Sequence, residues 1–173
     1  MTPRRAHDTG RRAFTLLELL AVISIIAILA GIVIGAGRRA SVAGKAARAK
    51  AELAAIGASL EAYKRIYGDY PQTDDEGQVL RALMGQRGPV SDATITGRVL
   101  FETARFAIAG NVLVDPWDRP YVYIYKAPPS GWTNSSYVFY SIGPDGIEAP
   151  TLLAGGFPDV APAANADNIY ANR

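Results

Sequence analysis

The residue of this chain whose chemistry most needs an explanation is Glu18, a carboxylate four residues after Phe14 at the start of a long apolar run. Residues 19–37 form a stretch of 19 residues without a charged side chain. As a helix this stretch measures about 28 Å, close to the hydrocarbon thickness of a bilayer. A charged side chain at mid-bilayer costs about 2.5 to 3.5 kcal/mol on insertion scales. Glu18 lies nearer the interface, where the cost is lower, but its charge still calls for a functional reason.

The composition of the chain limits which catalytic and metal-binding sites it can form. The chain has no cysteine and one histidine, His7, which precedes the apolar run. The remainder therefore lacks the groups for Ser-His or Cys-His catalysis and for His or Cys metal sites. It also lacks the disulfides that often staple small exported domains, so we expect stability from a core, a partner or a metal. Carboxylate chemistry by Asp145 with Asp159 or Asp167 stays open, so a membrane-anchored enzyme or binding module is the alternative of a different class.

The charge distribution indicates a membrane topology. Residues 1–13 hold four arginines and one aspartate, and the rest of the chain holds 14 basic and 15 acidic residues. The basic excess thus belongs to the N-terminal segment, and nothing suggests a body that binds nucleic acid. Arginines before an apolar run keep that end in the cytoplasm, although Arg38 and Arg39 oppose this bias. We predict a single-pass protein with an exported C-terminal domain.

A second helical pattern continues from the apolar run without a breaker. Its apolar positions recur at spacings of three and four residues, which is the pattern of one helix face. Gly68 then supplies a C-cap, with Pro71 close behind. We predict one helix over residues 15–67, apolar all round in its first half and amphipathic in its second. The stripe consists of Val42, Ala46, Ala49, Leu53, Ile56, Leu60, Tyr63 and Tyr67.

The remaining sequence predicts a small antiparallel sheet. Residues 76–84 have the pattern of a short helix, and residues 98–110 are ambiguous. A turn is predicted at residues 115–120, ahead of strands at 121–125 and 137–142, where aromatic and β-branched residues alternate. We expect these strands to form a hairpin whose apolar face packs on the helix stripe. The predicted fold class is α+β.

The N-terminal segment RRAFTLLE, residues 11–18, resembles the processing and assembly signal of type IV pilins and type II secretion pseudopilins. In those proteins a peptidase cuts before the Phe, the new amino terminus is methylated, and the Glu guides subunit packing. The resemblance implies a cleaved leader over 1–13, a cut between Ala13 and Phe14, and a transmembrane and filament-core helix over 14–37. Ala13 stands where the family usually has Gly, and its small side chain should still fit a tight peptidase subsite.

Later segments are similar to those of the major, G-type pseudopilin. They are residues 60–64 and 68–71, Asp-Pro-Trp at 115–117, Pro-Tyr at 120–121 and Tyr-Ser-Ile-Gly-Pro-Asp-Gly at 140–146. The family's Gly after Asp-Pro-Trp is Asp118 here. Because Asp tolerates turn geometry better than most residues, we expect the turn to survive.

The resemblance also implies the fold, the function and the partners. It implies a pilin fold, with an α/β domain over residues 38–173 in the periplasm and a long C-terminal loop from about residue 143. The protein would be a structural subunit of a homo-oligomeric pseudopilus in type II secretion, and not an enzyme. Its partners would be minor pseudopilins, prepilin peptidase and an inner-membrane assembly platform, and it would bind no nucleic acid.

A calcium site is a further implication of the resemblance. In the family, the loop after the last strand can hold Ca²⁺, which takes six to eight oxygen ligands. Asp145 matches the family's Asp, and the carbonyl of Ile142 matches its backbone ligand. Asn165 and Asp167 resemble the later acidic segment, and Asp159 is a further candidate. The alternative is that these are solvated turn residues.

Four other interpretations of the N-terminal half stay open. The near alternative is a major or minor type IV pilin. An ordinary signal anchor would make Glu18 a stray interfacial acid. A twin-arginine export signal would use Arg11 and Arg12, and a conventional signal peptide would be cut near residues 35–37.

Overall fold

The structure, a computed structural model, describes residues 14–90, 94–125, 136–149, 151–153 and 155–172. It falls into two compact units, Met1–Ser41 and Val42–Arg173. Helix α1, Leu16–Tyr67, is 52 residues long and contributes to both units. The helix predicted over 15–67 is therefore confirmed, whereas the predicted leader lies outside the described residues.

Within the first unit, α1 has no buried side chain. Its large apolar residues are exposed all round, from 80% at Leu16 down to 46% at Val22. Water is a poor environment for such a surface, so this segment needs lipid or other helices as its surroundings.

Within the second unit, α1 buries the predicted stripe from Ala49 to Tyr63, whereas Val42 is 45% exposed and its predicted place in the stripe is wrong. Leu53, Ile56, Leu60 and Tyr63 have no exposed surface. The helix ends where Gly68 adopts a φ of +86° and donates its N–H to the Lys64 carbonyl at 2.8 Å. Glycine adopts this left-handed conformation at no steric cost, so the predicted C-cap is confirmed.

The other elements of the second unit are short. Helix α2 is capped by Asp75, whose carboxylate accepts hydrogen bonds from the N–H groups of Gly77 and Gln78. Strands β1 and β2 form one antiparallel pair, and the order β3-β4-β5 forms an antiparallel three-stranded sheet. The bounds are α2 Glu76–Leu83, η1 Thr103–Arg105, β1 Ala107–Ala109, β2 Val112–Val114, β3 Val122–Tyr125, β4 Tyr137–Ser141, η2 Ala163–Asn165 and β5 Ile169–Tyr170.

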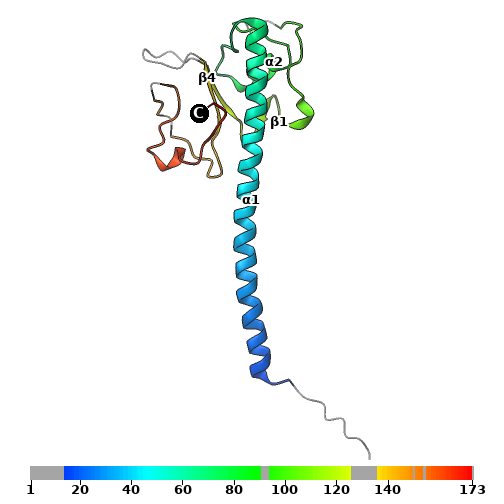
Figure 1. Ribbon diagram of the computed structural model, residues 1–173, viewed down its shortest axis with the longest axis vertical. Helices are drawn as coiled ribbons and strands as arrows, with labels where there is room; N and C mark the ends of the chain where they lie inside the picture. The colour runs from blue at the N-terminus through cyan, green and yellow to red at the C-terminus, as the bar shows by residue number, and fades with distance from the viewer. Residues whose placement is uncertain (1–13, 91–93, 126–135, 150, 154, 173) are drawn as a thin grey trace, which may run out of the picture. The chain divides into compact units, whose positions relative to one another are not determined.

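One apolar core joins α1, α2 and strands β2 to β5, and the second half of α1 runs beside these elements (Figure 1). Tyr123 pairs with Phe139 across β3 and β4, and both side chains pack in the same core as Leu53 of α1. The predicted hairpin on the helix stripe and the α+β class are thus confirmed. The β1–β2 pair and strand β5 were not predicted, because residues 98–110 gave an ambiguous pattern and β5 is only two residues long.

Candidate assembly, processing and metal sites

The start of α1 holds Glu18 in a reciprocal capping arrangement with Thr15. The Thr15 N–H and hydroxyl donate to Oε2 of Glu18 at 2.8 and 3.0 Å, and the Glu18 N–H donates to the Thr15 hydroxyl at 3.2 Å. This is a capping box, in which a residue before the helix and an acid three residues later satisfy the first free N–H groups. Within the described residues, both hydrogen bonds to this carboxylate use Oε2, which leaves Oε1 for a partner from another chain.

The surroundings of Glu18 are those of a membrane helix. In the described part of the chain, α1 is the one helix that is long and apolar enough to cross a bilayer, with a mean hydropathy of 2.9 in its most apolar window. Phe14 lies just before the helix with 78% of its surface exposed. Ala13, the predicted residue before the cut, lies outside the described residues. The structure therefore places Phe14 and Glu18 together at one helix end and leaves the cleavage itself a prediction.

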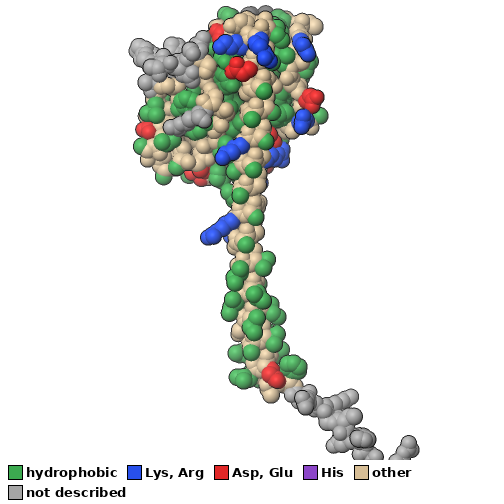
Figure 2. Space-filling model, in the orientation of Figure 1, with side chains coloured by type: hydrophobic (Ala, Val, Ile, Leu, Met, Phe, Trp, Pro, Cys, Tyr) green, Lys and Arg blue, Asp and Glu red, His purple; other side chains and the backbone are tan. Residues whose placement is uncertain are grey.

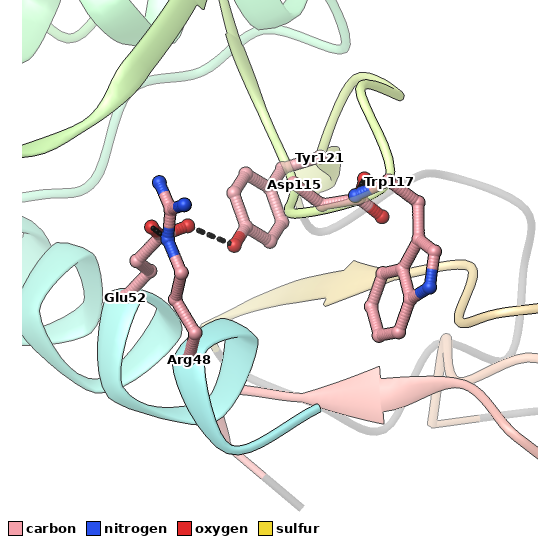
Figure 3. Close-up of polar contacts among 5 residues, drawn as sticks. All are labelled: Arg48, Glu52, Asp115, Trp117 and Tyr121. Carbon is pink, nitrogen blue, oxygen red and sulfur yellow. Dashed lines mark hydrogen bonds and ion pairs between the residues drawn. The ribbon is translucent and has the colours of Figure 1, made fainter. Parts of the chain in front are cut away.

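A buried polar contact ties the second half of α1 to the strands (Figure 3). Tyr121 donates its hydroxyl to Oε2 of Glu52 at 2.7 Å, and Nε of Arg48 donates to Oε1 at 2.7 Å. Glu52 is 7% exposed and Tyr121 is fully buried. Burial and the contact with Glu52 raise the pKa of the Tyr121 hydroxyl, so Tyr121 stays a neutral donor. Since the bond spans 69 residues of sequence, local patterns gave no signal for it.

The Asp-Pro-Trp turn is built around the buried carboxylate of Asp115. Its Oδ1 accepts from the N–H groups of Trp117 and Arg119 at 2.9 and 3.1 Å, and its Oδ2 accepts from the Ser141 hydroxyl at 2.5 Å. Asp118 has a φ of +65°, the left-handed conformation that glycine adopts most easily. The expectation that the turn survives with Asp118 in place of Gly is therefore confirmed.

The same turn braces the start of the C-terminal loop. Nη1 of Arg119 donates to the Gly143 carbonyl at 2.6 Å and Nη2 donates to the Pro144 carbonyl at 3.4 Å. The guanidinium also lies against Gly146, where an added Cβ would come within 2.2 Å of it. Arg119 thus fixes the segment that carries Asp145.

Two of the candidate metal ligands, Asp145 and Asp167, lie together at the end of β4. The Asp145 N–H donates to Oδ2 of Asp167 at 3.1 Å, while Oδ1 of Asp167 is buried and has no hydrogen-bond partner among the described residues. Gly143 packs so closely that an added Cβ would lie 2.4 Å from the Asp167 carbonyl oxygen. Ile142 immediately precedes this contact.

Asn165 and Asp159 form a separate structural cluster. The side chain of Asn165 is 1% exposed and is bonded to the backbone, through Oδ1 to the Ala149 N–H and through Nδ2 to the carbonyls of Ala149 and Asp159. Oδ1 of Asp159 accepts from the Ala161 N–H at 3.0 Å. Asn165 therefore closes the C-terminal loop, and both its polar atoms are occupied.

The donor chemistry fits Ca²⁺ in part. An orphaned carboxylate oxygen beside a second aspartate is the hard oxygen environment that Ca²⁺ prefers. Among the described residues, no three His, Cys, Asp or Glu side chains form a group that could hold a metal. A site here would thus use Asp145, Asp167, backbone carbonyls such as that of Ile142, and water. The calcium site stays a prediction.

Comparisons with known proteins agree with the residues described above. The family description "Type II secretion system (T2SS), protein G" matches residues 38–152, and "Prokaryotic N-terminal methylation motif" matches residues 8–34. The chain is similar to the type II secretion system core protein G of Pseudomonas aeruginosa, with 32% identity over 165 residues that cover 95% of this chain and 99% of the relative. No solved structure matches the chain.

Proposed function

Since this chain belongs to the type II secretion system protein G family, and is a structural subunit of the pseudopilus anchored in the inner membrane, we propose how it is processed and assembled. Prepilin peptidase removes residues 1–13 by cutting between Ala13 and Phe14, and the new amino group of Phe14 is methylated. The observation that carries this proposal is the capped Glu18 at the start of α1, whose apolar first half is exposed all round.

The membrane orientation follows from charge. Arginines ahead of the apolar run keep the N-terminus in the cytoplasm, so the unit Val42–Arg173 enters the periplasm. The leader holds the subunit in the membrane until cleavage frees the amino group of Phe14.

We propose that Glu18 then stabilises the assembled subunit relative to the lone one. Before assembly, Thr15 is the hydrogen-bond donor to this carboxylate among the described residues, and the carboxylate otherwise meets a low-dielectric environment as the helix end enters the bilayer. In the filament, Glu18 pairs with the Phe14 amino group of a neighbouring subunit. An ion pair in low dielectric is strong, and an unpaired buried carboxylate is costly. The same charge therefore penalises lone subunits and sets the stagger between assembled ones.

The periplasmic unit has a structural function. We propose that Asp145 and Asp167 hold Ca²⁺ with the Ile142 carbonyl, and that the ion supplies a positive charge that joins the two aspartates and orders the loop. The partners that we propose for the chain are further copies of itself, minor pseudopilins, prepilin peptidase and the inner-membrane assembly platform. We infer a structural and not an enzymatic role, because the family description and the relative that covers 95% of this chain are those of a type II secretion system core protein.

The test is recovery of filaments from cells that carry Glu18→Gln or Thr15→Val in an otherwise intact secretion system. Glu18→Gln removes the charge and keeps the side-chain volume, so we expect normal insertion and loss of sheared filaments. Thr15→Val removes the hydroxyl that satisfies the carboxylate before assembly, so fewer subunits should insert stably in the membrane. Because the inserted subunits keep Glu18, we expect fewer filaments rather than none. The control is Ser24→Ala, which removes another hydroxyl from the same apolar segment, where it donates to the Leu20 carbonyl and to no other group in the described part of the chain. Wild-type filament yield from Glu18→Gln would contradict the assembly role.

A further inference from the structure

We propose that the C-terminal loop of one copy of this chain docks into a groove on the next copy, between the second half of α1 and residues 98–106. This inference rests on the proposed filament function and names the surfaces of the periplasmic unit that meet. Both surfaces lie within the unit Val42–Arg173.

The groove consists of two adjoining hollows beside α1. Their volumes are about 540 and 520 Å³, and Leu100, Phe101 and Glu102 line both. The α1 side of the first hollow includes the small residues Ala51 and Ala55. A groove with a partly apolar lining and small residues on one wall has room for large apolar side chains from a partner.

The charges around the groove are mainly basic. Four arginines line the two hollows, against two glutamates. Both glutamates form ion pairs with two of these arginines, Glu52 with Arg48 at 2.7 Å and Glu102 with Arg105 at 3.8 Å, so the excess positive charge comes from Arg65 and Arg98. The surface is therefore complementary to an acidic partner. The arginines are Arg48, Arg65, Arg98 and Arg105.

The C-terminal loop has the matching chemistry. Residues 143–173 contain four acidic residues and one basic residue, Arg173. Asp145 and Asp167 belong to the proposed calcium site and Glu148 accepts from the Tyr140 hydroxyl, so Asp159 is the acid that this docking uses. Part of the loop forms a tight hairpin, in which the Leu153 N–H donates to the Phe157 carbonyl at 2.8 Å. The hairpin presents Leu152 and Leu153, which are 42% and 46% exposed. An acidic segment with leucines at its surface suits a basic groove with an apolar lining, since opposite potentials set the register and buried apolar area adds affinity.

The two surfaces lie on different sides of the unit. In Figure 1 the C-terminal segment lies to the left of α1, whereas β1, which closely follows η1 at Thr103–Arg105, lies to its right. Figure 2 shows basic side chains spread over the face that α1 crosses, with acidic side chains between them. Different complementary surfaces on one chain make a heterologous contact, which repeats from copy to copy without closing into a dimer. That is the kind of contact a filament needs.

The absence of cysteine from the sequence makes disulfide trapping a clean test. The full chain with Ala55→Cys and Leu153→Cys is expressed with its secretion system, and sheared filaments are oxidised with copper phenanthroline. We expect a ladder of dimers, trimers and higher species that collapses on reduction, and no ladder from either single variant. The matched control is Ala58→Cys with Leu153→Cys, because Ala58 is exposed on α1 but lines neither hollow.

The outcomes separate this proposal from the filament function. Filaments that contain the paired-cysteine chain but give no ladder would overturn the docking and leave the filament function standing. Dimers alone, an equal ladder from the Ala58 control, or cross-links only to a different protein would also overturn it. If the wild-type chain forms no filaments, the filament function itself fails.

Discussion

The hydrogen bond from Tyr121 to Glu52 predicts a measurable loss of stability in the variant Tyr121→Phe. The change removes one hydroxyl and leaves the aromatic ring, so it creates no large cavity. The donor is fully buried and its acceptor is a 7% exposed carboxylate at 2.7 Å. A hydrogen bond to a charged group contributes about 1.5 to 3 kcal/mol. Because Arg48 still donates to Glu52 in the variant, we expect a loss of about 2 kcal/mol in the free energy of unfolding.

The assay is urea and thermal unfolding of the unit Val42–Arg173, which has its own core. For a domain of this size the loss corresponds to a fall in Tm of roughly 6 to 10 °C. The matched control is Tyr125→Phe, whose hydroxyl donates to Asp69 at 2.6 Å in a partly exposed position. We expect a loss of at most about 1 kcal/mol there, because water can replace the lost donor. Equal losses in the two variants would refute the reasoning, since burial of Glu52 would then make no difference.

Three further predictions concern the turn, the calcium site and pH. Asp118→Gly should raise the free energy of unfolding by about 0.5 to 1 kcal/mol, because Gly adopts the φ of +65° without strain; a lower urea midpoint than wild type would contradict this. Asp167→Ala should abolish the rise in Tm on adding Ca²⁺ and change the Tm in chelator little, and a calcium response that survives the substitution would exclude Asp167 as a ligand. Burial raises the pKa of Tyr63 and Tyr137 to about 12. In the unfolded chain tyrosines titrate near pH 10 and lose their protons first, so the free energy of unfolding falls as the pH rises from about 10 through 12. A urea midpoint that is unchanged between about pH 9 and 11 would contradict this.

The parts of the fold that depend on local sequence patterns were predictable. Residues Leu53, Ile56, Leu60 and Tyr63 recur with helical spacing, and all four are fully buried on one face of α1. Helix ends are likewise local, because a cap contacts residues only two to four positions away. Gly68 showed the end of α1 for this reason.

The parts that depend on contacts between distant segments were not predictable. Strand β5 is only two residues long and pairs with β4 from 28 positions away, as in the register of Ser141 with Ile169. Arg119 reaches carbonyls 24 and 25 residues ahead, which its sequence context does not indicate. Charged residues on a helix are usually solvated, so Glu52 gave no sign that it would be buried.

The candidate site residues also divide into those that local sequence predicted and those that it could not. Glu18 stood out because a charge beside an apolar run is costly, and the Thr-x-x-Glu pattern at Thr15 was a local signal that could have predicted its capping partner. The metal candidates came from a resemblance rather than from local physics. The structure brings Asp145 and Asp167 together across 22 residues but turns the amide of Asn165 to the backbone, and spacing alone could not separate these cases.

The most direct test of the central claim is the intact mass and N-terminal sequence of the chain extracted from native membranes. Our account predicts a chain that begins with methylated Phe14, which would commit Glu18 to pairing with that amino group in the filament. A chain that begins at Met1 would mean a simple anchor. One that begins near Arg38 would mean a released domain, and either result would contradict assembly into a pseudopilus.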